Sequence, residues 1–372
     1  MKIIGSFYFV IMCFVCIGCN MSSSVVEHRG QKTLSWSMSA LDSIPLQADS
    51  VSWAGDYFTV SDRLCFFDAK TGMLNFFSWK TGELLRRSLR TGRARNELPD
   101  GGMGAALVGD SNRVFIYCEN FLYLYDIAKD ELSNEGFINF GYYKPRETGN
   151  YESPTIYKLC YLDIYLLDSN TLLLPLASND NTFEGWYEKS HIWGCYDYKR
   201  KEFTRLAGHL PPYYKEHPVP LFERFASCRV GETFLTTHVL DSLIYVHDGL
   251  DDVAYCFGYE ATGADRKYTC KENDVYDTAR AREDDNRLTE NKSLLYSESG
   301  RCLLRTCING QNGNSTTTVQ LYDLDSFDLV AERTYPGPLN FIYSEGDVFY
   351  GVNIMPETGQ NSIFYFKVTR GK

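Results

Sequence analysis

Short apolar runs bounded by Gly, Asp, Asn or Ser recur along most of the chain. In the first of them, Gly55–Asp56 opens a run that ends at Val60, and Leu64–Phe67 then ends at Asp68. Short runs rich in aromatic and β-branched residues, bounded by turn-forming residues, are typical of β-strands. The pattern therefore predicts an all-β protein built from many short strands.

These strands fall into six loosely similar copies. Each copy has a turn with Gly, Asp or Ser, an apolar strand, and a second strand that in most copies ends next to Asp. The copies open at residues 55, 109, 168, 231, 300 and 346. Their spacing is near the roughly 40 to 50 residues of a propeller blade, with insertions. We therefore expect a β-propeller, with six blades favoured over seven, and a pair of β-sandwiches as the alternative.

The last copy ends with the chain, which leaves the ring without a covalent closure. An open outer edge exposes unpaired backbone groups, and propellers avoid such edges. We expect early residues such as Thr33–Trp36 to complete the outer strand of the sixth blade and close the ring.

The first residues have the pattern of an export signal. Lys2 supplies one positive charge, residues 3–17 are almost wholly apolar, and Gly18 precedes Cys19. The apolar run is shorter than the roughly 20 residues of a membrane-spanning helix. The ending resembles a lipobox, although Cys16 stands where Leu is usual. An uncleaved anchor and an ordinary signal peptide are the alternatives.

The lipobox reading divides the chain into three parts. Residues 1–18 are a lipoprotein signal peptide that is cut off, and Cys19 carries the acyl chains that enter the lipid bilayer. Residues 19–33, rich in serine and poor in large apolar side chains, are the lipid anchor and a flexible tether. Residues 34–372 form the propeller domain.

Charge and cysteine content narrow the classes further. The formal net charge is −11, so the chain lacks the basic surface that binds nucleic acid. Nine of the twelve cysteines follow Cys19; their number is odd, and none belongs to a CxxC pair. Most stand singly in apolar runs, as small buried hydrophobic residues do. One bridge, Cys302 with Cys307 or Cys256 with Cys270, stays open.

One local motif resembles a known family. Gly92, Arg93, Glu97 and Leu98 match the Gly-Arg-Gly-Pro-x-Glu-aliphatic turn of the TolB-like six-bladed propeller lipoproteins common in Bacteroides and its relatives, and Ala94–Arg95 replaces Gly-Pro. The resemblance extends over the mature chain at the level of architecture. It implies a membrane-anchored propeller for which binding roles are favoured, and it assigns no functional residue.

The resemblance also bears on location and on the motif itself. In that group, acidic residues directly after the lipidated cysteine are associated with surface export, and Asn20–Ser23 has none. We therefore expect a lipid-anchored protein of the bacterial cell envelope, on the periplasmic face rather than the cell surface. Arg93 and Glu97 are expected to brace the turn between blades.

Catalytic and metal motifs are sparse. The sequence contains no Gly-x-Ser-x-Gly and no His-Glu-x-x-His, so it predicts no cofactor and no metal. Asn179–Asn181 with Glu184 is oxygen-rich but lacks the ligand spacing of a calcium loop. Glu283–Asp285 lies in a charged insertion that looks exposed, with a helical turn. Sugar hydrolysis would need two carboxyl groups from different elements.

Two insertions carry aromatic side chains suited to recognition. The first holds Trp186 and Tyr187, and the second, residues 210–219, holds Tyr213, Tyr214 and His217. Aromatic residues on loops of a rigid scaffold are good binding anchors for a glycan or a peptide. The alternative is that these rings cap the ends of blades.

A binding module is the leading functional hypothesis, ahead of an enzyme. The propeller would act as a platform for a protein or carbohydrate partner. The alternative is a propeller hydrolase or lyase whose site in the central channel is assembled from dispersed His, Asp and Glu residues. His238 and His247 lie nearest to strand interiors. A channel metal held by them would favour the enzyme, whereas burial among apolar side chains would count against it.

Overall fold

The structure of the chain is a computed structural model. It describes residues 25–28, 30–60, 62–94, 96–99, 104–108, 113–118, 121–137, 154–156, 164–178, 190–216, 224–269, 278–310, 314–354 and 361–371. Among these residues, no helix is long and apolar enough to cross a membrane.

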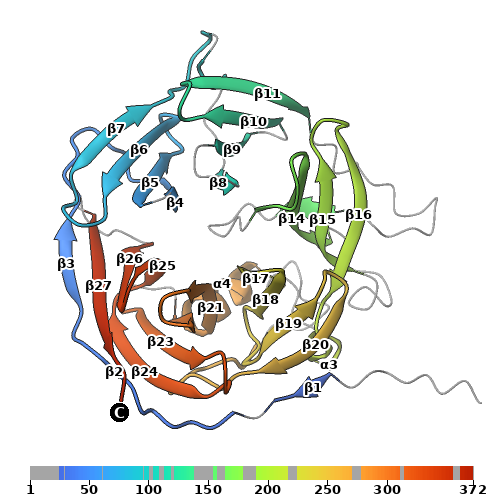
Figure 1. The fold of residues 1–372 in the computed structure, drawn as a ribbon, viewed down its shortest axis with the longest axis vertical. Helices are drawn as coiled ribbons and strands as arrows, with labels where there is room; N and C mark the ends of the chain where they lie inside the picture. Colours follow the sequence, from blue (N-terminus) through green and yellow to red (C-terminus); the bar gives the residue numbers. More distant parts are fainter. Residues whose placement is uncertain are drawn as a thin grey trace, which may run out of the picture.

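Six separate sheets surround a common centre and form the blades of a propeller (Figure 1). Blade 1 contains β4 (Gly55–Val60), β5 (Arg63–Asp68), β6 (Met73–Ser78) and β7 (Leu84–Ser88). Blade 2 contains β8 (Gly104–Val108), β9 (Arg113–Cys118), β10 (Phe121–Asp126) and β11 (Glu131–Phe137). Blade 3 contains β12 (Pro154–Ile156), β13 (Tyr165–Leu166), β14 (Thr171–Ser178), β15 (His191–Asp197) and β16 (Glu202–His209).

The second half of the ring is built in the same way, with strands added from the N-terminus. Blade 4 contains β17 (Phe225–Val230), β18 (Thr233–His238), β19 (Ile244–Asp248) and β20 (Asp252–Phe257), with β1 (Val26–Glu27) at its edge. Blade 5 contains β21 (Thr289–Ser297), β22 (Cys302–Asn309), β23 (Thr316–Asp323) and β24 (Leu329–Pro336). Blade 6 contains β25 (Leu339–Glu345), β26 (Val348–Asn353) and β27 (Ser362–Thr369), with β2 (Ser37–Met38) and β3 (Asp42–Pro45). The predicted all-β class and the six-bladed propeller are confirmed.

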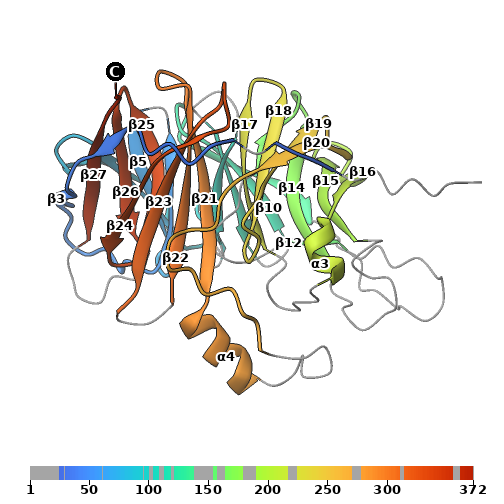
Figure 2. The ribbon, with the colours of Figure 1, turned by 90° about the horizontal axis from the view of Figure 1, so that it is seen from below.

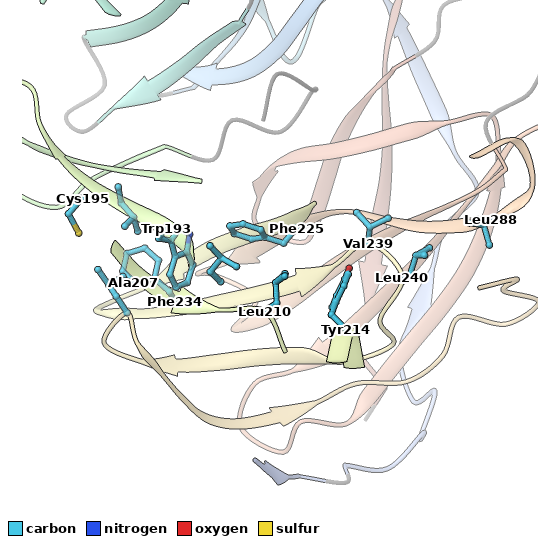
Figure 3. Packing of buried hydrophobic residues seen from close by; sticks show 13 residues of the cluster. Trp193, Cys195, Ala207, Leu210, Tyr214, Phe225, Phe234, Val239, Leu240 and Leu288 are labelled. Atoms are coloured by element: carbon cyan, nitrogen blue, oxygen red, sulfur yellow. The ribbon is translucent and has the colours of Figure 1, made fainter. Parts of the chain in front are cut away.

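Apolar side chains hold neighbouring blades together. Among the residues that the structure describes, the buried hydrophobic side chains form six clusters, and each cluster joins two adjacent blades around the ring. In the cluster between blades 3 and 4, Trp193 of β15 packs against Phe225 and Phe234 of blade 4 (Figure 3). A middle strand therefore has neighbours on both of its faces. This explains why Leu64–Phe67 of β5 is a continuous buried run rather than an alternating one.

The first of the six sequence copies was one strand out of phase. In the second copy, the expected strands match β9 and β10, the second and third strands of blade 2. In the first copy they match β4 and β5, the first and second strands of blade 1. The shift arose because the turn residues that mark the start of the first copy, Gly55–Asp56, open β4, the first strand of the blade. The two residues between β4 and β5 include no glycine, so they did not mark the start of a copy. The count of six blades is unaffected.

Ring closure uses N-terminal residues, but a few positions later than expected. Both β2 and β3 pair antiparallel with β27 and supply the outer strand of blade 6. The expected segment, Thr33–Trp36, lies instead on blade 5. There the backbone N–H groups of Thr33 and Trp36 donate to the carbonyl oxygens of Leu329 and Val330 at 3.1 and 2.9 Å.

Residues 25–28 and 30–47 form an N-terminal strap along the outside of the ring (Figure 1). The strap begins at β1, which pairs parallel with β20 of blade 4, and ends where the Gln47 N–H donates to the Gly82 carbonyl oxygen of blade 1 at 2.8 Å. It therefore covers the outer edges of four consecutive blades. From Val26 onward, the segment expected to be a flexible tether is paired with the blades, because their edges offer unpaired backbone groups.

The described cysteines behave as small buried hydrophobic residues. Six of them are free and buried: Cys65, Cys195, Cys228, Cys256, Cys302 and Cys307. Neither of the two disulfides left open by the sequence forms, since Cys256, Cys302 and Cys307 are all free. Cys302 and Cys307 stand five positions apart on β22, so their side chains point to opposite faces of the blade.

Candidate functional site

The connection from blade 4 to blade 5 carries α4 (Thr278–Arg287), which projects from one face of the ring (Figure 2). The short α3 (Pro212–Glu216) lies at the same face, called here the helical face. The sequence predicted a helical turn in this charged insertion, and α4 confirms it. The helix is docked rather than free, because the buried Asp284 carboxylate accepts hydrogen bonds from the Thr269 N–H and hydroxyl at 2.9 and 2.7 Å.

Beneath α4, four charged side chains meet at the inner ends of blades 4 and 5. Glu290 Oε2 lies 2.6 Å from Lys292 Nζ, and both residues belong to β21. Arg224, directly before β17, places Nη2 3.3 Å from Glu290 Oε1 and 3.9 Å from Asp285 Oδ1 of α4. We call Arg224, Asp285, Glu290 and Lys292 the ionic cluster. It links the first strands of two blades with the helix above them.

Solvent reaches the ionic cluster from one side. The side chains of Glu290 and Lys292 are 0% and 5% exposed, whereas those of Arg224 and Asp285 are 13% and 46% exposed. The register of β21 against β22 also shifts between Asn291 and Ser293, which leaves Lys292 at a bulge. Bulges are common next to functional sites because they redirect a side chain. The cluster is thus a buried charge pair with an opening at Asp285.

The two carboxyl groups of the cluster differ in acidity. Burial would raise the pKa of Glu290, but the Lys292 ammonium and the Arg224 guanidinium outweigh it and hold this pKa below its ordinary value. Burial and the neighbouring Glu290 carboxylate raise the pKa of Asp285. Neighbouring carboxyl groups whose pKa values move apart are typical of acid–base pairs. Asp285 therefore takes up a proton more readily than Glu290 does.

A polar network supports the cluster from behind. The Arg266 guanidinium donates to the Val239 carbonyl oxygen and to Asn291 Oδ1, both at 2.9 Å. Asn291 Nδ2 in turn donates to the carbonyl oxygens of His238 and Asp241 at 2.7 and 2.6 Å. These bonds tie β21 to blade 4 at Asn291, directly after Glu290. Hydrogen bonds among the residues next to a site hold the side chains of the site in a fixed geometry.

The aromatic candidates from the second insertion lie in or near the core. Tyr214 on α3 is fully buried in the cluster between blades 3 and 4, with its ring 5.5 Å from that of His238 (Figure 3). Tyr213 is partly buried and packs edge-on against Tyr214. The capping alternative therefore describes Tyr214, whose ring presents no exposed face. The remaining candidates lie outside the described residues: Cys19, Trp186, Tyr187, His217, and the oxygen-rich loop at 179–184.

The two histidines considered for a channel metal are core residues. Burial lowers the pKa of His238 to about 3 and that of His247 to about 4, so both rings are neutral near pH 7. His247 Nε2 lies 2.9 Å from the Thr236 hydroxyl, and its ring packs 4.8 Å from the indole of Trp193. In the part of the chain that the structure describes, no three His, Cys, Asp or Glu side chains gather as metal ligands.

The motif at residues 91–98 forms a braced turn between blades 1 and 2. The Glu97 carboxylate accepts the Ala94 N–H at 2.8 Å and pairs with Arg90, and Leu98 is fully buried in the cluster between these blades. Glu97 thus braces the turn, as expected. Arg93 differs from expectation, since it offers its backbone N–H to Glu97 and leaves its side chain exposed.

Comparison with known proteins gives information on the fold. No protein family and no curated protein matches the sequence. A crystal structure of a member of the DUF4221 family from Bacteroides vulgatus is 12% identical, with a TM-score of 0.67 over 91% of this chain and 100% of that one. A protein from Bacteroides fragilis, named as exported, is 14% identical, with a TM-score of 0.52 over 94% and 100%. What they share with this chain is the fold.

Sequence reasoning found one member of the ionic cluster and missed three. Asp285 was among the paired carboxylates considered, but it was assigned to an exposed insertion. Glu290, Arg224 and Lys292 belong to no motif in the sequence. One signal was available: Glu290 and Lys292 stand two apart, on one side of a strand that continues as Leu294–Leu295. Opposite charges at that spacing, directly before an apolar run, indicate a buried pair.

Proposed function

We propose that this protein is a cell-envelope lipoprotein, anchored through acyl chains on Cys19, whose propeller is a binding platform for a protein or carbohydrate partner. The observation that carries the proposal is the ionic cluster under α4. The fold, and the likeness in fold to an exported protein, are consistent with this role.

The energetic argument starts from the cost of buried charge. Removing an ion from water costs several kcal/mol, and an apolar contact of similar size often stabilises a fold at least as well. Apolar clusters already join every pair of neighbouring blades, including blades 4 and 5. The ionic cluster is therefore not required to hold the ring together. Buried charges of this kind, open to solvent at one end, are typical of functional sites.

The chemistry at the opening suits a polar partner. Arg224 offers N–H donors, and the half-exposed Asp285 offers both a donor and an acceptor when it is protonated. Sugar hydroxyl groups and the polar groups of a peptide both complement such a pair. We place the binding surface on the helical face, where Asp285 reaches solvent.

The strap brings the propeller close to the proposed anchor. Six residues lie between Cys19 and Val26, so seven Cα–Cα steps separate the proposed lipid from a residue that is already paired with blade 4. An extended chain of that length spans at most about 25 Å. A lipidated Cys19 would hold the domain next to the membrane. In the similar lipoproteins, acidic residues directly after the lipidated cysteine are associated with surface export. Asn20–Ser23 has none, which favours the periplasmic side.

Two experiments test the proposal separately. Metabolic labelling with a radioactive fatty acid should mark the wild-type chain but not C19A, and C19A should leave the membrane fraction.

For the platform, the detergent-solubilised full-length chain is immobilised and exposed to envelope extract and to a glycan array. We expect D285A and R224A to lose the ligand that the wild type retains. The control is K80A, which removes an exposed ion pair with Glu345 at 3.0 Å. Equal retention by all variants would contradict the assignment of this face.

An acid–base enzyme, a hydrolase or lyase, is the second candidate. The observation that favours it is the carboxyl pair of Asp285 and Glu290, which come from different elements and whose pKa values move in opposite directions. Asp285 would act as the acid and Glu290 as the charged partner. Turnover of a glycan or glycoside library by the wild type, lost in D285N, would support this reading. Turnover that D285N retains would remove it.

A further inference from the structure

Two of the histidines face each other at the helical face of blade 3. His191 opens β15 and His209 ends β16, and the two residues are direct partners across the antiparallel ladder. Side chains of direct partners lie on the same face of a sheet. Their ring centroids are 4.7 Å apart, with an angle of 39° between the ring planes. His209 is exposed and His191 is half-buried.

A hydrogen bond sets the protonation of the His209 ring. Its Nδ1 lies 3.1 Å from the carbonyl oxygen of Ser190. A carbonyl oxygen can only accept, so Nδ1 carries the hydrogen, and the neutral ring has its lone pair on Nε2. Histidines that bind metals commonly have this arrangement, in which one nitrogen donates to a backbone carbonyl and the other is left for the metal. Ser190 is buried, which fixes this carbonyl at the start of β15.

We propose that His191 and His209 form a binding site for a divalent transition metal of the Zn²⁺ type. Imidazole nitrogen is a preferred ligand for such ions, whereas Ca²⁺ and Mg²⁺ prefer oxygen. Two protein ligands leave the other coordination positions to water or to a group of a bound partner. The site goes beyond the platform function, since it lies on blade 3 and shares no residue with the ionic cluster.

The ring separation is compatible with shared coordination. With Zn–N bonds of about 2.0 to 2.1 Å and tetrahedral angles, the two ligating nitrogens lie roughly 3.3 Å apart. A centroid separation of 4.7 Å is of the size expected for two imidazole rings that share one ion. The ladder between β15 and β16 keeps the two backbones in place. The site is therefore preorganised at the level of the strands.

Calorimetric titration of the metal-free full-length chain with Zn²⁺ tests the site. We expect binding of one ion per chain, weakened at least about tenfold in both H191Q and H209Q. The matched control is H28Q, because His28 is exposed and lies on the strap next to blade 4. Circular dichroism and thermal unfolding show whether each variant keeps its fold. No binding by the wild type, or unchanged binding in folded H191Q and H209Q, would overturn the proposal.

A second measurement does not depend on the variants. Long-range ¹H–¹⁵N correlation spectra of the histidine rings report which nitrogen is protonated and which binds a metal. Without metal, we expect the hydrogen of His209 on Nδ1. With Zn²⁺, the Nε2 signal of His209 and one nitrogen signal of His191 should shift together, while the buried His238 and His247 stay unchanged. A shift confined to other histidines would place the metal elsewhere and refute the site.

Discussion

Lys292 Nζ lies 2.6 Å from Glu290 Oε2, and neither side chain has more than 5% of its surface exposed. In that environment the Glu290 carboxylate is stabilised by the Lys292 ammonium and the Arg224 guanidinium, and the Lys292 ammonium by Glu290, because water is excluded. Removing Lys292 takes the nearest counterion away from the buried Glu290 carboxylate. The pair therefore couples the stability of blade 5 to the chemistry of the proposed site.

The first prediction concerns the energy of this pair. K292M should destabilise the fold by about 3 to 5 kcal/mol, because Glu290 loses its nearest counterion in a buried site. K80M should change the stability by at most about 1 kcal/mol, because Lys80 and its partner Glu345 are both solvent-exposed. Urea unfolding of both variants gives the comparison. Equal effects of the two substitutions would show that the buried pair is no stronger than a surface pair.

The second prediction is a loss of stability in mild acid. Burial lowers the pKa of His238 to about 3, well below the ordinary value near 6.5. The folded state therefore binds fewer protons than the unfolded state between these values, and stability falls as the pH falls from about 6.5 towards 3. At pH 5 the loss due to this group is about 2 kcal/mol.

Unfolding of H238Q at pH 7.5 and pH 5 measures this contribution. Gln does not titrate, so the difference between the two pH values should be smaller than in the wild type by about 2 kcal/mol. H28Q, at an exposed position, should keep the wild-type difference. An unchanged difference in H238Q would mean that His238 is not the group responsible for the acid sensitivity.

The third prediction concerns ring closure. Leu46 lies near the end of the strap and is 3% exposed in the cluster between blades 6 and 1, whereas Leu34 on the same strap is 48% exposed. L46A should cost about 2 to 5 kcal/mol, and L34A less than about 0.5 kcal/mol. In L46A the amides of β27, which pair with β3, should also exchange faster with solvent. Similar behaviour of the two variants would mean that the strap is not part of the closure.

The sequence predicted those features that follow from local patterns. Alternation and turn residues gave the strands and the number of blades, and the motif around Glu97 gave a brace between blades. The wrong predictions concern features that depend on contacts between residues far apart in the sequence. The register of the strap depends on which blade edge accepts it, and Tyr214 is buried because Leu210 and His238 surround it. The same reason hid the ionic cluster, whose members span residues 224 to 292 and meet only after two blades and a helix have docked.

The fourth prediction tests the braced turn at Gly92. A Cβ atom built on Gly92 would lie 1.9 Å from the Glu97 carboxylate. The Glu97 side chain can move away, but it then loses its bonds to the Ala94 N–H and to Arg90. We expect G92A to cost about 1 to 3 kcal/mol, the range for losing bonds to a charged group. Because E97A already lacks these bonds, G92A should cost much less in that background. Denaturant unfolding of the four proteins of this cycle gives the coupling, which should exceed about 0.5 kcal/mol. Simple additivity would mean that Glu97 does not brace the turn and that the glycine serves another purpose.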